Sequence, residues 1–218
     1  MKNNDSNRIA SQVKVLGISG SLRPGSYTRK AVRIALEGAR EAGAETLLLD
    51  LREYDLPFSS GNPRERNYPE DVYRLREEIR DADGVILGSP EYHGGMSGVL
   101  KNALDLMGFK EFEGKLIGLV GVSGGVMGAS NALVSLRNVG RALHAWVIPE
   151  QVSIPRAWQK FNQDGSLKDE GLRDRLRRVG EQVAHYSSLH ALDQEQAFVK
   201  EWEIAPANPG GSRQRKLR

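Results

Sequence analysis

The stretch VKVLGISGSLRPGSYT, residues 13–28, decides the fold of this chain. It begins with a mainly apolar, partly β-branched run, which predicts a strand, and turns polar after Ile18. Helical spacing of apolar residues then resumes at Ala31, Val32, Ala35, Leu36 and Ala39. Strand, polar loop and helix in this order are typical of an α/β protein with a parallel sheet.

The loop between this strand and helix is suited to an anion. A helix N-terminus offers unpaired N–H groups and the positive end of the helix dipole, so phosphate is stabilised there. Gly20 and Gly25 allow close backbone approach, and Arg23 adds a charged group. Hydroxyl donors come from Ser19, Ser21, Ser26 and Thr28.

Two better-known phosphate loops do not fit this stretch. It lacks the GxGxxG pattern, and its Walker-like spacing from Gly20 to Ser26 has no lysine to reach the outer phosphates of ATP. We therefore expect a monophosphate or a simple nucleotide tail. A capped helix after a tight turn is the alternative interpretation.

Composition predicts one cytoplasmic domain. The 218 residues can bury a full core, and the absence of cysteine excludes disulfides and thiolate metal sites. Residues 1–12 are polar and predict a flexible N-terminus without a signal peptide, and no later span is apolar enough for a membrane. The four histidines are scattered, so we expect no metal site.

The basic charge lies in the C-terminal tail. The chain carries +3 overall, but residues 205–218 hold four basic residues and no acid, and subtracting these four leaves −1 for the rest. We expect a domain at 13–190 followed by an extension at 191–218, whose tail is rich in Pro, Gly and Ser and predicted to be disordered. A solvated terminus explains this tail better than nucleic-acid binding does.

Strand-like and helical segments alternate along the domain. We predict strands at 13–18, 46–51, 84–88, 116–122 and 145–154, and helices near 28–42, 69–81, 97–108, 128–143 and 169–190. This alternation predicts a doubly wound parallel sheet with helices on both faces. Ligands of such sheets bind beyond the carboxyl ends of the strands, so the loops after the first, third and fourth strands should meet.

The second and third of these loops have few large side chains. PEYHGGMSG at residues 90–98 contains the aromatic residue Tyr92, three glycines, and Ser97 as a candidate helix N-cap. GVSGGVMG at residues 121–128 is nearly bare. Two such loops beside a phosphate loop indicate a flat ring held by main-chain groups.

At this point the sequence resembles the NADPH-dependent FMN reductase family, the flavodoxin-like quinone, azo-compound and chromate reductases. The resemblance spans about residues 13–188 and lies in GSLRPGSYT at 20–28, DLP at 55–57, PEYHGG at 90–95 and GVLKNALD at 98–105. It implies a flavodoxin-like five-stranded sheet with strand order 2-1-3-4-5 and a bound FMN.

The resemblance also implies which residues hold the cofactor. Ser19, Ser21, Arg23, Ser26, Tyr27 and Thr28 would surround the phosphate, with Thr28 where many members have asparagine. Pro90, Glu91, Tyr92, His93 and Gly94 would border the isoalloxazine, and Ser123, Gly124 and Gly125 would close its other edge. His93 departs from the common asparagine.

In the chemistry implied by this resemblance, NADPH or, alternatively, NADH gives hydride to FMN, and a small-molecule acceptor then takes the electrons. Quinones, azo or nitro aromatics, metal ions and free flavin are the expected acceptors. No protein nucleophile is needed, because the cofactor carries the reaction. Backbone N–H groups of Gly94 and Gly95 would lie near the flavin edge and stabilise the reduced ring.

Two other classes of function remain open at this stage. A flavodoxin-type electron carrier would use the same fold, but the near-neutral body lacks the acidic surface that favours docking to basic partners. A serine hydrolase could use Ser123, because GVSGG at 121–125 matches the nucleophile-elbow pattern after a predicted strand. That interpretation leaves the other two loops unexplained.

The predicted helix at 97–108 suggests self-association. Its apolar residues, Val99, Leu100, Ala103, Leu104, Leu106 and Met107, spread around most of the circumference. One sheet can cover only one side of a helix, so we expect a homodimer or homotetramer built on this segment, with core packing as the alternative.

Overall fold

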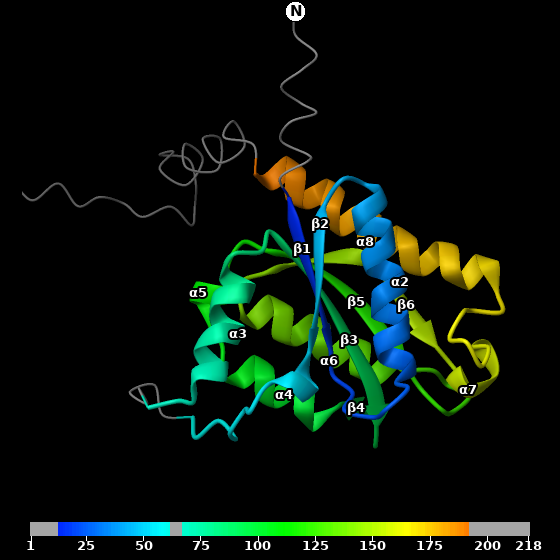
Figure 1. Ribbon diagram of the computed structural model, residues 1–218, viewed down its shortest axis with the longest axis horizontal. Coiled ribbons are helices and arrows are strands. Elements are labelled where there is room, and N and C mark those ends of the chain that lie inside the picture. The colour runs from blue at the N-terminus through cyan, green and yellow to red at the C-terminus, as the bar shows by residue number, and fades with distance from the viewer. Residues whose placement is uncertain (1–12, 62–66, 192–218) are drawn as a thin grey trace, which may run out of the picture.

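The computed structural model describes residues 13–61 and 67–191. The predicted flexible N-terminus and the basic tail lie outside the described residues. The five main strands are β1 (Lys14–Ser19), β2 (Glu45–Asp50), β3 (Gly84–Tyr92), β5 (Leu116–Val122) and β6 (Trp146–Ile154). They pair in parallel in the order β2-β1-β3-β5-β6, which confirms the predicted 2-1-3-4-5 order (Figure 1).

Helices cover both faces of this sheet. On one face α2 (Tyr27–Glu41) and α8 (Glu170–His190) pack on a core that includes Val15 and Val120. On the other face α3 (Glu70–Arg80), α4 (Gly98–Asp105) and α6 (Ser130–Ala142) pack on a core that includes Leu16 and Leu87. The short elements are η1 (Leu51–Glu53), α5 (Phe109–Phe112) and α7 (Ala157–Lys160). Within residues 13–61 and 67–191, we find no helix with the length and apolarity needed to cross a bilayer.

Local sequence fixes both ends of α2. At its start the Ser26 hydroxyl accepts a hydrogen bond from the Arg29 N–H at 3.2 Å, as an N-cap does. At its end Gly43 has a φ of 93°, and the N–H groups of Gly43 and Ala44 bond to the carbonyls of Arg40 and Ala39. These two bonds form a Schellman motif, which a glycine in the left-handed region favours.

Two glycines let α2 and α8 touch backbone to backbone. A Cβ added at Gly38 would lie 2.0 Å from the Arg177 carbonyl oxygen, and one at Gly180 would lie 1.7 Å from the Ala35 oxygen. Any other residue at these positions would push the helices apart. The two helices therefore form one layer on this face of the sheet, with α2 over β1 and β2 and α8 over β5 and β6.

The third strand is longer than predicted. Instead of ending at Gly88, β3 runs to Tyr92, and Ser89 and Pro90 pair in parallel with Gly121 and Val122 of β5. After Tyr92 the chain turns back into the two-residue strand β4 (Gly95–Met96), which pairs antiparallel with β3. The predicted 90–98 loop is therefore mostly a hairpin.

The argument for an interface on helix 97–108 does not hold. The helix ends at Asp105, and Leu100, Leu104, Leu106 and Met107 are buried within the chain itself, as is Ala103. Except for Leu106, these side chains share a core cluster with Leu75 and Ile79 of α3 as well as with residues of the sheet. Core packing explains the apolar residues of this segment. Self-association stays a prediction, but this helix no longer supports it.

Candidate functional site

The loops after β1, β3 and β5 meet at the carboxyl edge of the sheet, as expected. They enclose a cavity of about 470 Å³, and Ala157 and Trp158 in the segment after β6 complete its wall. The lining residues are Ser21, Arg23, Pro24, Gly25, Ser26, Tyr27, Thr28, Pro90, Glu91, Tyr92, Val122, Ser123, Gly124, Ala157 and Trp158. The chain thus builds one hollow from segments more than a hundred residues apart.

Four of the candidate cofactor residues do not line this cavity. Ser19 is fully buried at the end of β1, and its hydroxyl has no partner among the described residues. His93 and Gly94 lie at the tip of the hairpin, and Gly125 lies one residue beyond the lining. The other ten candidates are brought together around the hollow.

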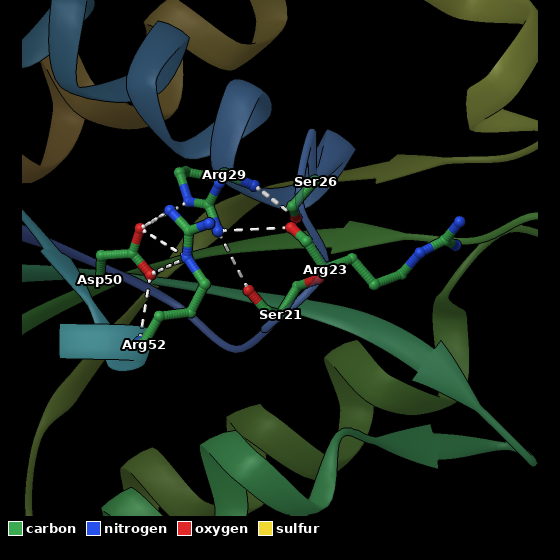
Figure 2. A network of polar contacts seen from close by, with 6 residues as sticks. All are labelled: Ser21, Arg23, Ser26, Arg29, Asp50 and Arg52. Atoms are coloured by element: carbon green, nitrogen blue, oxygen red, sulfur yellow. Dashed lines mark hydrogen bonds and ion pairs between the residues drawn. The ribbon is translucent and has the colours of Figure 1, made fainter. Parts of the chain in front are cut away.

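A buried ion pair supports the first loop from behind, and the sequence analysis missed it. Arg29 Nε lies 2.9 Å from the Asp50 carboxylate, with both side chains about nine-tenths buried. The Arg29 guanidinium also donates to the carbonyls of Ser21 and Arg23, at 3.4 and 3.5 Å. Figure 2 shows this network, in which the Arg23 side chain extends away from Arg29. The sequence signal that could have predicted this pair is Asp50, a carboxylate at the carboxyl end of an apolar strand.

Asp50 holds a second guanidinium as well. Arg52 binds its two carboxylate oxygens, with distances of 2.6 to 3.1 Å. These hydrogen bonds lower the pKa of Asp50, while burial opposes that shift. Burial lowers the pKa of Arg29, and the nearby Asp50 charge partly offsets that effect. Because the pKa of an arginine lies far above physiological pH, Arg29 stays positively charged despite this lowering.

Gly20 serves packing rather than ligand approach. A Cβ at Gly20 would lie 2.7 Å from Leu100 Cβ and 2.9 Å from the Ser97 hydroxyl oxygen. Ser97 donates to the Gly20 carbonyl at 2.6 Å while accepting from Leu100 N–H as the predicted N-cap of α4. The first and second loops are therefore joined through α4. Gly25 keeps its predicted freedom, with a φ of 66° in the turn before α2.

The backbone of the hairpin tip suits an asparagine at position 93. His93 and Gly94 have φ values of 51° and 76° and lie between the paired residues Tyr92 and Gly95. Positive φ at both central residues is the requirement of a type I′ turn, for which Asn-Gly is the preferred sequence. The asparagine that the resemblance implies at this position would fit this backbone, and His93 occupies it at a conformational cost.

The third loop holds Ser123 in a local turn. Ser123 Oγ accepts from the Gly125 N–H at 3.0 Å, and the Ser123 carbonyl accepts from Ala157. A hydrolase would need a histidine beside Ser123, but the ring of His190 makes a tilted contact with that of Trp146, which begins β6 at the opposite edge of the sheet. His185 lines a surface groove with Glu41 at the end of α2. The described residues thus place neither imidazole beside Ser123.

A second, more apolar hollow adjoins the first. It has a volume of about 440 Å³ and is lined by Leu22, Leu51, Tyr54, Leu56, Phe58, Tyr92, Ser97, Gly98, Val99 and Asn102. Tyr92 borders both cavities, and Phe58 is 90 % exposed. Asn102 fixes the segment carrying Phe58, because it donates to the Pro57 carbonyl and accepts from the Ser59 N–H, both at 3.0 Å.

The fold and this site define a flavodoxin-like α/β protein with a cavity beyond the carboxyl ends of β1, β3 and β5. The model of the family "NADPH-dependent FMN reductase" matches residues 13–159. The chain belongs to that family.

Similar proteins agree with this assignment. An FMN-dependent NADPH-azoreductase of Staphylococcus aureus is 34 % identical over 179 residues, which cover 80 % of this chain and 95 % of that protein. The structure of the flavoenzyme NAD(P)H:(acceptor) oxidoreductase FerB from Paracoccus denitrificans is 28 % identical, with a TM-score of 0.61 over 83 % of this chain and 100 % of its own. A flavone reductase, 22 % identical with a TM-score of 0.65, shares the fold; the match covers 85 % of this chain and 65 % of the reductase chain.

Proposed function

We propose that this chain binds FMN in the 470 Å³ cavity and uses it to pass electrons from NADPH to a small-molecule acceptor. NADH is the alternative electron donor. The observation that carries the proposal is the cavity itself, which joins the phosphate loop, the PEYHGG hairpin and the loop at Ser123 in a chain of this family. FMN, when bound, accepts a hydride from the nicotinamide and passes the electrons on.

The donors around the first loop fit a phosphate. Tyr27 and Thr28 open α2, so their N–H groups have no carbonyl within the helix to bond. Ser21, Ser26 and Thr28 add hydroxyl groups to the wall. Among the described residues, Arg23 has no carboxylate within ion-pair distance, so its charge is available to an anion at the mouth of the cavity.

The remaining walls suit the flat ring. Pro90, Glu91 and Tyr92 would lie along one side, and Ser123 and Gly124 along the other. The backbone amides of Gly94 and Gly95 on the hairpin would donate to the ring edge and favour its reduced, more negative state. The described residues offer no serine–histidine pair there, in keeping with chemistry that belongs to the cofactor.

The apolar hollow beside Tyr92 favours an aromatic acceptor. Its lining offers Phe58, Leu56 and Val99 as contact surfaces for a quinone or azo compound. Burying the face of such a ring against them would stabilise binding by about 25 cal/mol per Å² of apolar surface removed from water.

The test begins with the absorbance spectrum of the purified protein and its bleaching by NADPH without oxygen. We expect a flavin spectrum that bleaches, and recovers when a quinone or an azo dye is added. Phe58→Ala should raise KM for the aromatic acceptor while leaving ferricyanide reduction unchanged, and Phe109→Ala, an exposed phenylalanine outside both hollows, is the matched control. Reduction that requires a partner protein would favour an electron carrier instead.

We also propose that the working unit is a homo-oligomer. Its support is the exposed apolar surface around the start of α6, where Val126, Met127 and Val134 are 60, 86 and 58 % exposed. A second copy of the chain would cover these side chains. Sedimentation of Met127→Glu beside the unchanged protein tests this, and an unaltered monomer in both would contradict it.

A further inference from the structure

We propose that Arg29 is a positioning residue that shapes the loop at residues 21–28 for the phosphate of FMN. The inference rests on the proposed function, since it concerns the same cavity. Arg29 itself does not line that cavity. It acts through the backbone of the loop, which it holds from the inside.

The first step concerns the carbonyls of the loop. The oxygens of Ser21 and Arg23 accept hydrogen bonds from Arg29 Nη2 and are thus turned toward the buried guanidinium. A carbonyl oxygen turned into the cavity would repel a phosphate oxygen, because both carry negative charge. Arg29 removes two such oxygens from the ligand side.

The second step follows from the planar peptide. No cis peptide bond occurs in the described residues, so each N–H points opposite to the carbonyl of the residue before it. With the Ser21 carbonyl turned toward Arg29, the N–H of Leu22 points away from Arg29. The residue after Arg23 is Pro24, which has no N–H. The inward carbonyls therefore bring one amide donor to the outer side of the loop.

The third step concerns charge. Arg29 and Arg52 share the single carboxylate of Asp50, which leaves an excess of one positive charge behind the loop. Exposed Arg33 and Glu53 add one charge of each sign to these surroundings. Arg29 is about nine-tenths buried whereas Arg52 is 39 % exposed, so solvent screens the Arg29 charge less than that of Arg52, and the excess favours an anion in the cavity.

Arg52 provides a matched control. It binds the same carboxylate as Arg29, but its side chain is 39 % exposed, and among the described residues it bonds to Asp50 rather than to the loop. Replacing either arginine by lysine keeps the positive charge and removes the planar fork. Only at position 29 does that change release the loop carbonyls.

The experiment compares FMN with riboflavin, which lacks the phosphate. Dissociation constants are measured by quenching of flavin fluorescence with the full chain freed of cofactor, for the unchanged protein, Arg29→Lys and Arg52→Lys. We expect the unchanged protein to prefer FMN, Arg29→Lys to lower the FMN-to-riboflavin affinity ratio about tenfold, and Arg52→Lys to change it less than about threefold.

The outcomes separate the inference from the proposed function. An equal loss of FMN and riboflavin affinity in Arg29→Lys, or an unchanged ratio, would overturn the positioning role and leave Arg29 as a support of the fold. No preference for FMN in the unchanged protein would overturn the phosphate site itself. If Arg29→Lys does not fold by circular dichroism, Arg29→Gln, which removes both the positive charge and the planar fork, is measured for the same ratio with the same expected direction.

Discussion

The Glu91 carboxylate accepts a hydrogen bond from the backbone N–H of Ala132 at 3.0 Å, so a residue of β3 caps the start of α6. This helix has no cap of its own, because its N-cap residue is Ala129. Ser153 in β6 accepts from the Ala129 N–H at 2.8 Å and completes the arrangement. Two strands thus supply the acceptors that the sequence around residue 129 lacks.

The contact predicts a stability effect of Glu91. Glu91→Ala should lower the free energy of unfolding by roughly 0.5–2 kcal/mol, because it removes an acceptor and a negative charge from a helix N-terminus. Glu91→Gln should recover part of that loss through its amide oxygen. Urea unfolding of the cofactor-free protein measures both. Glu45→Ala, in an exposed strand position, is the control and should change little.

The type I′ turn at the hairpin tip makes a different prediction. His93→Asn should raise the free energy of unfolding by less than about 1 kcal/mol, since asparagine tolerates positive φ better, and His93→Val should lower it by roughly 1–2 kcal/mol. His185→Asn on the exposed face of α8 is the control, because histidine and asparagine have similar helix propensities. A more stable His93→Val would contradict the turn assignment.

Periodicity was sufficient to predict the sheet. Mainly apolar runs marked the five strands of the sheet, and helical spacing marked the covering helices, because both patterns follow from local geometry and burial. The strand order came from the family resemblance and is confirmed. The end of β3 was missed because Pro90 is a usual strand breaker, whereas here it pairs at the last position before the hairpin.

The site was predictable only where its residues are consecutive. The three loops were identified from their own composition, and ten of fourteen candidates line the cavity. Arg29 and Asp50 were missed because their pairing joins residues from different elements, which no local pattern reveals. Trp158 was missed because the loop after the last strand was not considered. The interface argument failed because the burial of Leu106 depends on which distant elements pack beside α4, and a local pattern does not reveal such packing.

Ser123 is expected to be dispensable for NADPH oxidation. Its hydroxyl oxygen bonds to the Gly125 N–H within the loop, so Ser123→Ala should loosen this turn but keep most of the activity. A hydrolase nucleophile would lose essentially all activity on the same change. The measurement is NADPH oxidation with a quinone, beside hydrolysis of a p-nitrophenyl ester. Ester hydrolysis that disappears in Ser123→Ala would support the elbow interpretation.

The last prediction concerns acid stability. Hydrogen bonds from Arg52 lower the pKa of Asp50 below its ordinary 3.8 in the folded protein, so the unfolded chain binds the proton first as the pH falls. Asp50 therefore stabilises the fold fully above pH about 4, and this contribution is lost as the pH falls through the lowered value. Asp50→Asn should be less stable than the unchanged protein near pH 7, and the difference should shrink below pH about 4. Urea midpoints from pH 2.5 to 7 measure this. Asp174→Asn, an exposed carboxylate on α8, should show no such convergence, and a constant gap in Asp50→Asn would mean that the carboxylate does not stabilise the fold through its charge.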